Sequence, residues 1–341
     1  MRTPGFLAIL QDQLENLPLE ILEAVNRPGG LEIRDLMDFV LKPKDYTVDA
    51  PYEVDPEHVL KNEKISIDAF WLGRDSLVEG TTAHCIIASG GAFEKMPLSD
   101  TTLLELQLMK TSWVKNVWIM VGPDRLEEAK KIVDSLGNSS RKVFTQYESF
   151  SLTPDNRLHE EEGEPLLHSC GEGDLIPALK HSGILESFIA SGGRHVIVCD
   201  GDNILGSAHP VIVGQHLLAK SIVTCEVTSR KRGDEHAILC EHGGFNQVVE
   251  NHRLSSHTDI EEFSLVSTGT YVFDVSLDFD SVKWKWHRTK SNLNNKLVVQ
   301  YKRSLCDLTA TYQTHFIETP RYFCFMPLRD YLREHQKNLQ K

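Results

Sequence analysis

The segment His195–Gly206, HVIVCDGDNILG, places carboxylates directly after a run of apolar residues. Its first residues are β-branched and apolar, which is typical of a strand buried on both faces of a parallel sheet. Asp200, Asp202 and Asn203 follow at the carboxyl end of that strand, where ligands bind in open α/β sheets. Carboxylate oxygens in this position suit Mg²⁺ that bridges phosphate groups. The alternative is a solvated turn in which these residues cap the next element.

A second loop that could bind a ligand contains paired glycines. Ser89, Gly90 and Gly91 follow the predicted strand 84–88, and Lys95 comes shortly afterwards. Glycines let backbone N–H groups approach a nucleotide closely, and a lysine adds a positive charge for phosphate. The alternative is a tight turn with a solvated lysine.

Two further segments carry candidate ligand-binding groups. Gly171 and Gly173 flank Glu172 in a loop that enters a predicted helix, and Asp174 is a candidate N-cap there. The alternative is an ordinary helix-entry turn. Arg329 lies near the carboxyl end of the chain and could clamp a phosphate bidentately, although by itself it would be a surface arginine.

The elements that position these residues alternate between strands and helices from residue 81 onward. Apolar runs predict strands at 84–88, 116–121, from 143, 195–199, 222–229, 236–240, 270–275 and 322–325. Helical periodicity predicts helices at 102–113, 126–136 and 174–191. We expect a hairpin around 232–234 and a surface loop at 154–166. This order predicts an α/β fold: a three-layer, Rossmann-like domain with a mostly parallel sheet and right-handed crossovers.

Residues 1–75 are predicted to form an N-terminal helical accessory region, an extension to the α/β domain at 76–341. Leucine-rich stretches at 14–22 and 31–40 have helix-like spacing, and Pro28-Gly29-Gly30 separates them.

Composition limits the classes of function. The net charge of −13 argues against a nucleic-acid-binding surface, which needs a basic face. No apolar run approaches the length of a membrane span. The seven scattered cysteines suit buried thiols in a reducing compartment, so we expect a cytoplasmic protein. His236, Cys240 and His242 resemble a zinc site in spacing, but a fourth ligand is missing and strand alternation explains the pattern.

The order and spacing of these motifs resemble those of the UDP-sugar pyrophosphorylases, the family of UTP:sugar-1-phosphate uridylyltransferases. The similarity covers roughly residues 80–332, about three quarters of the chain. The first matching segments are the Gly-Gly loop at 90–96 and the helix that starts T-L-L-E-L at 102–106. The family's F-x-Q corresponds to residues 144–146, its G-H-G-D to 171–174, and its D-N to 202–203. A family glutamate corresponds to Glu250, and the family's P-V-K corresponds to 327–329.

The resemblance implies a nucleotidylyltransferase, or pyrophosphorylase. Such an enzyme forms an NDP-sugar or NDP-sugar-like product and pyrophosphate from an NTP and a sugar-1-phosphate or a sugar-like cyclitol phosphate. The implied catalytic residues are Lys95, Asp202 and Arg329. The implied nucleotide-binding residues are Ser89, Gly90, Gly91, Gln146, Gly171, Glu172, Asp200 and Asp202, and the implied sugar-binding residues are Asn203, Glu250 and Thr268. Asp202 would hold Mg²⁺, the expected cofactor. The expected partners are small-molecule substrates rather than nucleic acid or membrane, and a homodimer is compatible with the sequence.

Several positions depart from the family pattern. The family's G-T-R is Phe93-Glu94-Lys95, and its N-T-N-N is Ser267-Thr268-Gly269-Thr270. The histidine of G-H-G-D is Glu172. Since a carboxylate only accepts hydrogen bonds, it pairs better with an N–H-rich base edge, which leaves GTP open beside the UTP that the family implies. The β-helical C-terminal domain of many members is not expected, because the sequence ends at Lys341.

Two other functions stay open at this stage. Asp200-Gly201-Asp202 has the D-x-D form with which glycosyltransferases hold a metal–nucleotide-sugar complex. The altered signature loop, in turn, suits a degenerate relative that binds nucleotide without turnover. Pyrophosphate release, sugar transfer to an acceptor, and binding alone would distinguish these three functions.

Overall fold

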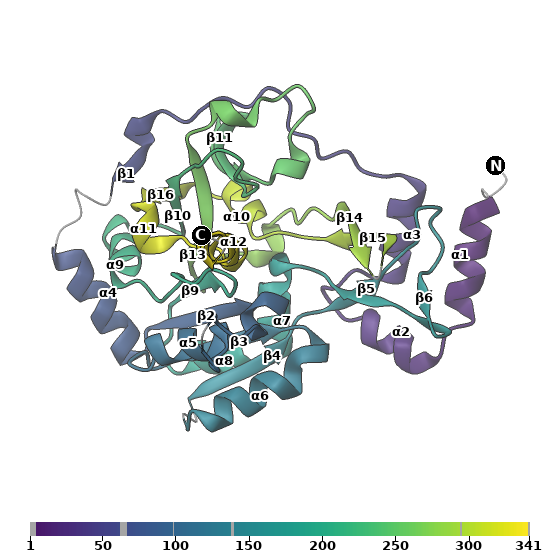
Figure 1. Ribbon diagram of the computed structural model, residues 1–341, viewed down its shortest axis with the longest axis horizontal. Coiled ribbons are helices and arrows are strands. Elements are labelled where there is room, and N and C mark those ends of the chain that lie inside the picture. The colour runs from purple at the N-terminus through teal and green to yellow at the C-terminus, as the bar shows by residue number, and fades with distance from the viewer. Residues whose placement is uncertain (1–4, 62–66, 98, 138–139, 294, 340–341) are drawn as a thin grey trace.

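The computed structural model describes residues 5–61, 67–97, 99–137, 140–293 and 295–339. A large mixed sheet forms its centre (Figure 1). The strands along this sheet are, in spatial order, β1 (Val59–Lys61), β16 (Thr314–Glu318), β10 (Val223–Ser229), β13 (Leu265–Asp274), β9 (His195–Asp200), β2 (Thr82–Ala88), β3 (Val117–Val121) and β4 (Arg141–Thr145). Of these, only β13 runs antiparallel to its neighbours β10 and β9, so the predicted mostly parallel sheet is confirmed.

Strand alternation explains how this sheet is buried on both faces. Successive side chains of a strand point to opposite faces, so Cys85 and Ile86 of β2 belong to different apolar cores. The core on one face includes α7 (Leu175–His181) and α8 (Ile184–Ala190). The core on the other face includes residues of α4 (Ile67–Glu79), α5 (Leu103–Lys110), α6 (Leu126–Ser135) and α9 (Pro210–Ala219). Helices therefore cover both faces, and the predicted three-layer fold is confirmed.

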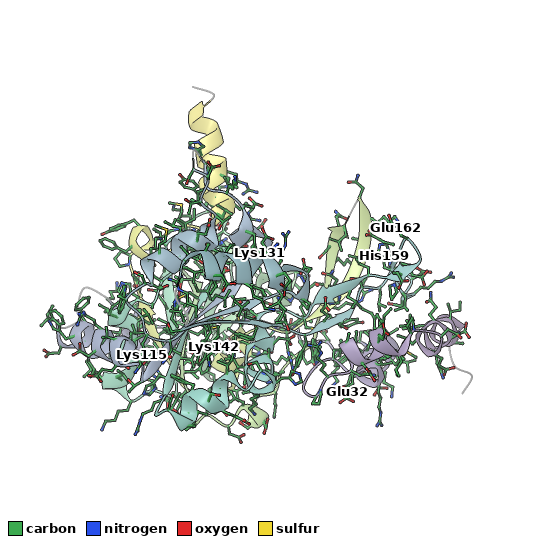
Figure 2. The ribbon with its side chains drawn as sticks, turned by 90° about the horizontal axis from the view of Figure 1, so that it is seen from below. Glu32, Lys115, Lys131, Lys142, His159 and Glu162 are labelled. Carbon is green, nitrogen blue, oxygen red and sulfur yellow. The ribbon has the colours of Figure 1, made fainter. Side chains whose placement is uncertain are left out.

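The N-terminal helices pack beside the sheet rather than on it (Figure 1). These are α1 (Gly5–Glu15), α2 (Leu19–Val25) and α3 (Ile33–Leu41). They share an apolar core with residues of two small antiparallel pairs, β5 (Glu148–Phe150) with β8 (Leu167–Ser169), and β14 (His287–Leu293) with β15 (Lys296–Lys302). A short hairpin, β6 (Glu160–Glu161) with β7 (Glu164–Pro165), lies within the predicted 154–166 loop. Figure 2 shows two residues of that loop, His159 and Glu162, on the same side of the molecule as the N-terminal helices.

Residues 1–75 contribute more than helices. After α3 the chain bridges to Leu254 through Val48 and to Glu241 through Tyr52. It then adds β1 to the edge of the central sheet beside β16. Residue 75, where the accessory region was predicted to end, falls inside α4.

Three predicted elements are wrong. The predicted 232–234 hairpin does not form, because β10 pairs with β13, while β11 (Ile238–His242) makes a hairpin with β12 (Phe245–Val249). Gly243 and Gly244 supply the positive φ angles of that turn. The predicted strand 322–325 is the helix α11 (Arg321–Cys324). The predicted helix 174–191 is divided into α7 and α8 at Gly183, whose φ of +70° interrupts helical geometry.

Two further helices lie in the carboxyl-terminal part of the described chain. The first is α10 (Cys306–Thr311), and the second is α12 (Leu328–Leu339), which projects from the body of the molecule (Figure 2). Within the described ranges, no helix combines the length and apolar character needed to cross a lipid bilayer. All seven cysteines are buried free thiols.

Candidate active site

Three loops meet where β2 and β9 end. The backbone N–H of Gly201, just after β9, donates to the carbonyl of Ile87 in β2 at 2.8 Å. The backbone N–H of Leu328, at the start of α12, donates to the carbonyl of Asp202 at 2.8 Å. Asn203 joins the same two segments, because its side chain binds the carbonyl of Cys324 and the N–H of Met326. The loops after β2 and β9 and the segment before α12 therefore converge.

The carboxylate of Asp202 lies at the centre of this convergence. Its Oδ2 accepts a hydrogen bond from Ser89 Oγ at 2.6 Å. Its Oδ1 is buried and has no hydrogen-bond partner among the described residues. Gly91 packs directly against it, since a Cβ at that position would lie 2.8 Å from Oδ1. A buried, unpaired carboxylate oxygen is costly unless a cation or donor satisfies it, and hard oxygen donors are the ligands that Mg²⁺ prefers.

Asp200 lies beside this group. Its Oδ1 accepts the backbone N–H of Asp202 at 3.0 Å. Burial, and next the neighbouring charge of Asp202, raise the pKa of Asp200 to about 7. Gly269, with φ of +74°, packs against its side chain, because a Cβ there would lie 2.9 Å from Asp200 Cβ. Two glycines thus leave room for the two carboxylates of the D-x-D sequence.

Two cavities open beside these carboxylates. The first, which we call the outer cavity, has a volume of about 550 Å³, and its lining includes Gly91, Glu94, Asp202 and Arg329. The second, the inner cavity, has a volume of about 400 Å³, and its lining includes Glu172, Glu250, Thr268, Gly269, Tyr271 and Cys306. Asp200, Glu235 and His236 line both, so the two cavities adjoin and form one cleft.

The inner cavity is rich in carboxyl groups. Ligand atoms of Glu172, Glu250 and Cys306 lie within 4.8 Å of one another. Ser304 Oγ donates to Glu172 Oε1 at 2.8 Å. Burial and the charge of Glu250 raise the pKa of Glu172 to about 7, and burial raises the pKa of Glu250. Such a wall suits hydroxyl groups, which can both donate to and accept from carboxyl groups.

The outer cavity contains Arg329, one of the two cations of the predicted site. Arg329 Nη1 pairs with Glu235 Oε2 at 2.9 Å, and both side chains remain substantially exposed. An exposed ion pair is held weakly, so a phosphate could replace Glu235 as the partner of Arg329.

The structure brings together eight of the predicted residues in and around this cleft. Gly91, Asp200, Asp202 and Arg329 line the outer cavity, Glu172, Glu250 and Thr268 line the inner one, and Ser89 holds Asp202. The Thr268 hydroxyl, however, donates to Glu226 Oε2 in the core at 2.9 Å. Glu172, predicted as a base contact, lies on the same side of the cleft as Glu250, the predicted sugar contact.

The other predicted residues lie outside the linings of the two cavities. Lys95 pairs with Asp100 at 2.9 Å on the surface. Asn203 is only 1% exposed and ties the loops together. The backbone N–H of Gln146 donates to the carbonyl of Val121, and Gly171 packs on the carbonyl of Arg303. A Cβ at Gly90 would meet no atom within 4 Å, so that position faces open space.

Sequence reasoning missed Glu235, Tyr271 and Ser304, and it considered His236 only for its metal-like spacing. Glu235 and His236 lie in the loop before β11, although a strand was predicted from residue 236, and Ser304 follows the unpredicted strand β15. No local motif distinguishes these positions. Only the folding of β10–β13 and α10 around the cleft places them there.

The chain is similar to known proteins in sequence and in fold. Two plant enzymes named UTP--glucose-1-phosphate uridylyltransferase align with the chain. The one from Pyrus pyrifolia is 27% identical over 158 residues (42% of this chain and 33% of that protein). The one from Musa acuminata is 26% identical over 188 residues (50% and 39%). The matched region thus spans between a third and two fifths of the length of these relatives.

Solved structures share the fold. A mutant UDP-glucose pyrophosphorylase from Leishmania major in complex with UDP-glucose superposes with a TM-score of 0.72 at 15% identity, covering 96% of this chain and 77% of that one. The uridine diphosphate N-acetylglucosamine pyrophosphorylase from Trypanosoma brucei superposes with a TM-score of 0.65 at 14% identity, covering 96% and 81%. The family model described as UTP--glucose-1-phosphate uridylyltransferase matches residues 129–329, more than half of the chain. This protein is therefore a member of the UTP--glucose-1-phosphate uridylyltransferase family.

Proposed function

We propose that this protein is a nucleotidylyltransferase that joins an NTP and a sugar-1-phosphate, or a sugar-like cyclitol phosphate, to form an NDP-sugar or NDP-sugar-like product and pyrophosphate. The observation that carries the proposal is the Asp202 carboxylate, which is fixed by Ser89 and Gly91 and keeps one unpaired oxygen beside the outer cavity. The named relatives favour UTP as the nucleotide, and GTP remains the alternative.

The residues around Asp202 fit a magnesium ion. Asp202 would hold it, and Asp200, two positions earlier in the sequence, would support the site. When bound there, Mg²⁺ would neutralise phosphate charge and orient the phosphates.

The two cavities suit different parts of the reactants. The outer cavity would take the phosphates, with Arg329 neutralising charge and the Ser89–Gly91 backbone approaching closely. The inner cavity would take the polyhydroxyl group, with Glu250, Glu172 and the Thr268 backbone around its hydroxyls. On this arrangement Glu172 recognises the acceptor rather than the base.

The reaction needs no protein nucleophile. An oxygen of the sugar phosphate attacks the α-phosphorus of the NTP in line, the bond from that phosphorus to the β-phosphate oxygen breaks, and pyrophosphate leaves. Such chemistry depends on positioning and on stabilising charge. Asp202 and Arg329 would carry these roles, and Asn203 would act by holding the loops together. Lys95 would contribute only after its surface pair with Asp100 opens.

The test is release of pyrophosphate by the full chain with Mg²⁺, each of the four NTPs, and a panel of sugar-1-phosphates and cyclitol phosphates. We expect release with one pair of substrates and its loss in Asp202→Asn. Asp155→Asn, which changes an exposed carboxylate of the 154–166 loop, serves as the matched control and should leave release unchanged. No release with any pair would overturn the proposal.

A second candidate function, nucleotide binding without turnover, is favoured by one observation. Lys95, the cation of the signature loop, is paired away from the cleft. Calorimetric binding of an NTP with Mg²⁺, combined with no pyrophosphate release from any substrate pair, would establish this function instead. Sugar transfer from an NDP-sugar to an acceptor would establish the glycosyltransferase alternative.

A further inference from the structure

A third cavity lies apart from the candidate active site. It has a volume of about 520 Å³ and shares no lining residue with the inner or outer cavity. We call it the rear cavity. Its walls come from the Pro28-Gly29 turn of the N-terminal region, from Tyr147 and α7, and from Phe279, Trp284 and Arg303. It therefore opens where the N-terminal region meets the main sheet.

The walls of the rear cavity combine aromatic rings with cations. Tyr147, Phe279 and Trp284 supply the rings. The guanidinium of Arg303 lies 5.9 Å from the ring centroid of Trp284, and Lys180 Nζ lies 5.7 Å from that of Phe279. Clefts of this size with mainly apolar walls and a few oriented polar groups are typical of small-molecule sites.

Two of the three charged groups that line the rear cavity are basic. Lys180 and Arg303 line it, against a single carboxylate, Asp280, which pairs with Lys180 at 3.2 Å at the exposed rim. Asp174, the partner of Arg303, is 0% exposed and does not line the cavity. A planar ring that carries an acidic group matches these walls, because its ring can stack on the aromatic residues while its anion faces the cations.

Arg303 connects the rear cavity to the active-site cleft. Its side chain lines the rear cavity, while the next residue, Ser304, donates to Glu172 Oε1 in the inner cavity. The loop 170–174 is held to the Arg303 backbone on both sides: Arg303 N–H donates to Cys170 O at 2.9 Å, and Gly173 N–H donates to Arg303 O at 3.1 Å. A Cβ at Gly171 would lie 2.6 Å from Arg303 O, so the two backbone segments are in tight contact there.

Asp174 provides a second connection. Its carboxylate accepts Arg303 Nε at 2.5 Å and the backbone N–H of Tyr147 at 3.0 Å. Tyr147 follows Gln146, which the family resemblance implies as a nucleotide contact. Arg303 Nη2 also donates to the carbonyl of Gly29 at 2.6 Å. A ligand that draws the guanidinium into the cavity would compete with Asp174 and Gly29 for its N–H groups.

We propose that the rear cavity is a second small-molecule site, which takes a planar aromatic anion and, when filled, weakens binding of the sugar phosphate in the inner cavity through Arg303, Ser304 and Glu172 of the 170–174 loop. Binding of the anion in the rear cavity is independent of the proposed function, whereas its effect on the inner cavity rests on that function. Coupling requires that the ligand bind the two arrangements of Arg303 with different affinity, and it is reciprocal between the sites.

The first experiment titrates the full chain with 8-anilinonaphthalene-1-sulfonate, a fluorescent aromatic sulfonate, in the absence of nucleotide. We expect saturable binding of one molecule per chain. Trp284→Ala and Lys180→Gln should each weaken binding about tenfold, the loss expected for one cation–π or charge-assisted contact. Lys180 is exposed, so its replacement tests the site even where Trp284→Ala fails to fold.

Trp71→Ala is the matched control for Trp284→Ala. Trp71 is also a partly exposed ring beside a guanidinium, 5.6 Å from Arg74, but it lies in α4 and does not line the rear cavity. Its replacement should leave binding of the probe unchanged. Binding that does not saturate, or that survives both Trp284→Ala and Lys180→Gln, would overturn the proposal.

The second experiment measures the KM for the sugar phosphate in pyrophosphate release, with and without saturating probe. We expect the probe to raise that KM several-fold in the wild type. In Ser304→Ala the probe should still bind while its effect on the KM is lost. An unchanged KM in the wild type would overturn the coupling. If no pyrophosphate is released from any substrate pair, the proposed function fails, whereas the titration of the rear cavity still stands or falls by itself.

Discussion

The contact between Gly91 and Asp202 leads to the sharpest prediction at the scale of single residues. Gly91→Ala places a methyl carbon where only 2.8 Å separates it from Asp202 Oδ1. The carboxylate must then leave Ser89, and a displacement of about 1 Å at a reacting group costs roughly a hundredfold in rate. We expect Gly91→Ala to fold and to lose about that much of the Mg²⁺-dependent pyrophosphate release.

A variant of the neighbouring glycine, Gly90, distinguishes a clash with the protein from a clash with the ligand. Gly90→Ala meets no protein atom within 4 Å, so any loss of activity there would report direct contact with the nucleotide. Full activity in Gly91→Ala would contradict the role of Asp202 in the cleft.

Glu172 leads to a prediction about pH. Burial and the charge of Glu250 raise its pKa to about 7, so it is neutral below that pH and becomes charged above it. A second negative charge in the inner cavity repels the phosphate of the acceptor. We expect the KM for the sugar phosphate to rise between about pH 6 and pH 8 in the wild type (roughly one pH unit on either side of that pKa), and to rise less in Glu172→Gln, in which only Asp200, whose pKa is also about 7, still titrates in this range. Steady-state kinetics across this range would check it, and an equal rise in both proteins would contradict it.

The candidate site was predictable from the sequence only where local chemistry is visible. Polar residues directly after an apolar strand, as at Asp200 and Asp202, indicate a ligand site because such groups have no place in a core. Ser304 and Glu235 give no such signal. They reach the cleft through long-range packing, which no local pattern encodes.

At the scale of elements, the crossing of α4 and α9 leads to a prediction about stability. The two helices touch through glycines: a Cβ at Gly214 would lie 1.7 Å from the carbonyl oxygen of Ala69, and one at Gly73 would lie 1.8 Å from that of Pro210. Helix propensity alone would make Gly214→Ala stabilising by about 1 kcal/mol. The backbone clash should reverse that sign and lower the free energy of unfolding by about 1–3 kcal/mol.

Thermal or urea unfolding of Gly214→Ala would check this prediction. Gln215→Ala, one residue along the same helix and only partly buried, is the matched control and should change stability little. A raised midpoint in Gly214→Ala would mean that the helices do not cross at these glycines.

The same scale explains which elements the sequence could predict. Strands β2, β3 and β9 are mostly apolar, since both faces of a parallel sheet are covered, and their positions are confirmed. The pairing of β10 with β13 joins residues about forty positions apart in the sequence, and no turn motif between them indicates that they pair. The hairpin of β11 and β12 could have been found from Gly243-Gly244, a pair suited to a two-residue turn.

At the scale of the whole molecule, burial of neutral histidines indicates sensitivity to acid. His84 lies in the central strand β2 at 1% exposure, and neither ring nitrogen has a hydrogen-bond partner within the described part of the chain. Burial lowers the pKa of His84 to about 3, and burial is also the main cause that lowers the pKa of His216 to about 3. Unfolded chains bind protons on these rings below a pH of about 6.5. The folded protein does not bind them until about 3, so these histidines reduce stability as the pH falls from 6.5.

Replacing the imidazole with an apolar side chain of similar volume should remove this dependence at one position. We expect His84→Leu to raise the free energy of unfolding, because it deletes two unpaired polar atoms from the core. The gain should grow between pH 7 and pH 5, since only the wild type then faces the proton uptake of its unfolded chain. Urea unfolding at both pH values would measure it, with the exposed His58→Leu as the control that should show no such trend. An equal gain at both pH values would mean that His84 is protonated alike in the folded and unfolded protein.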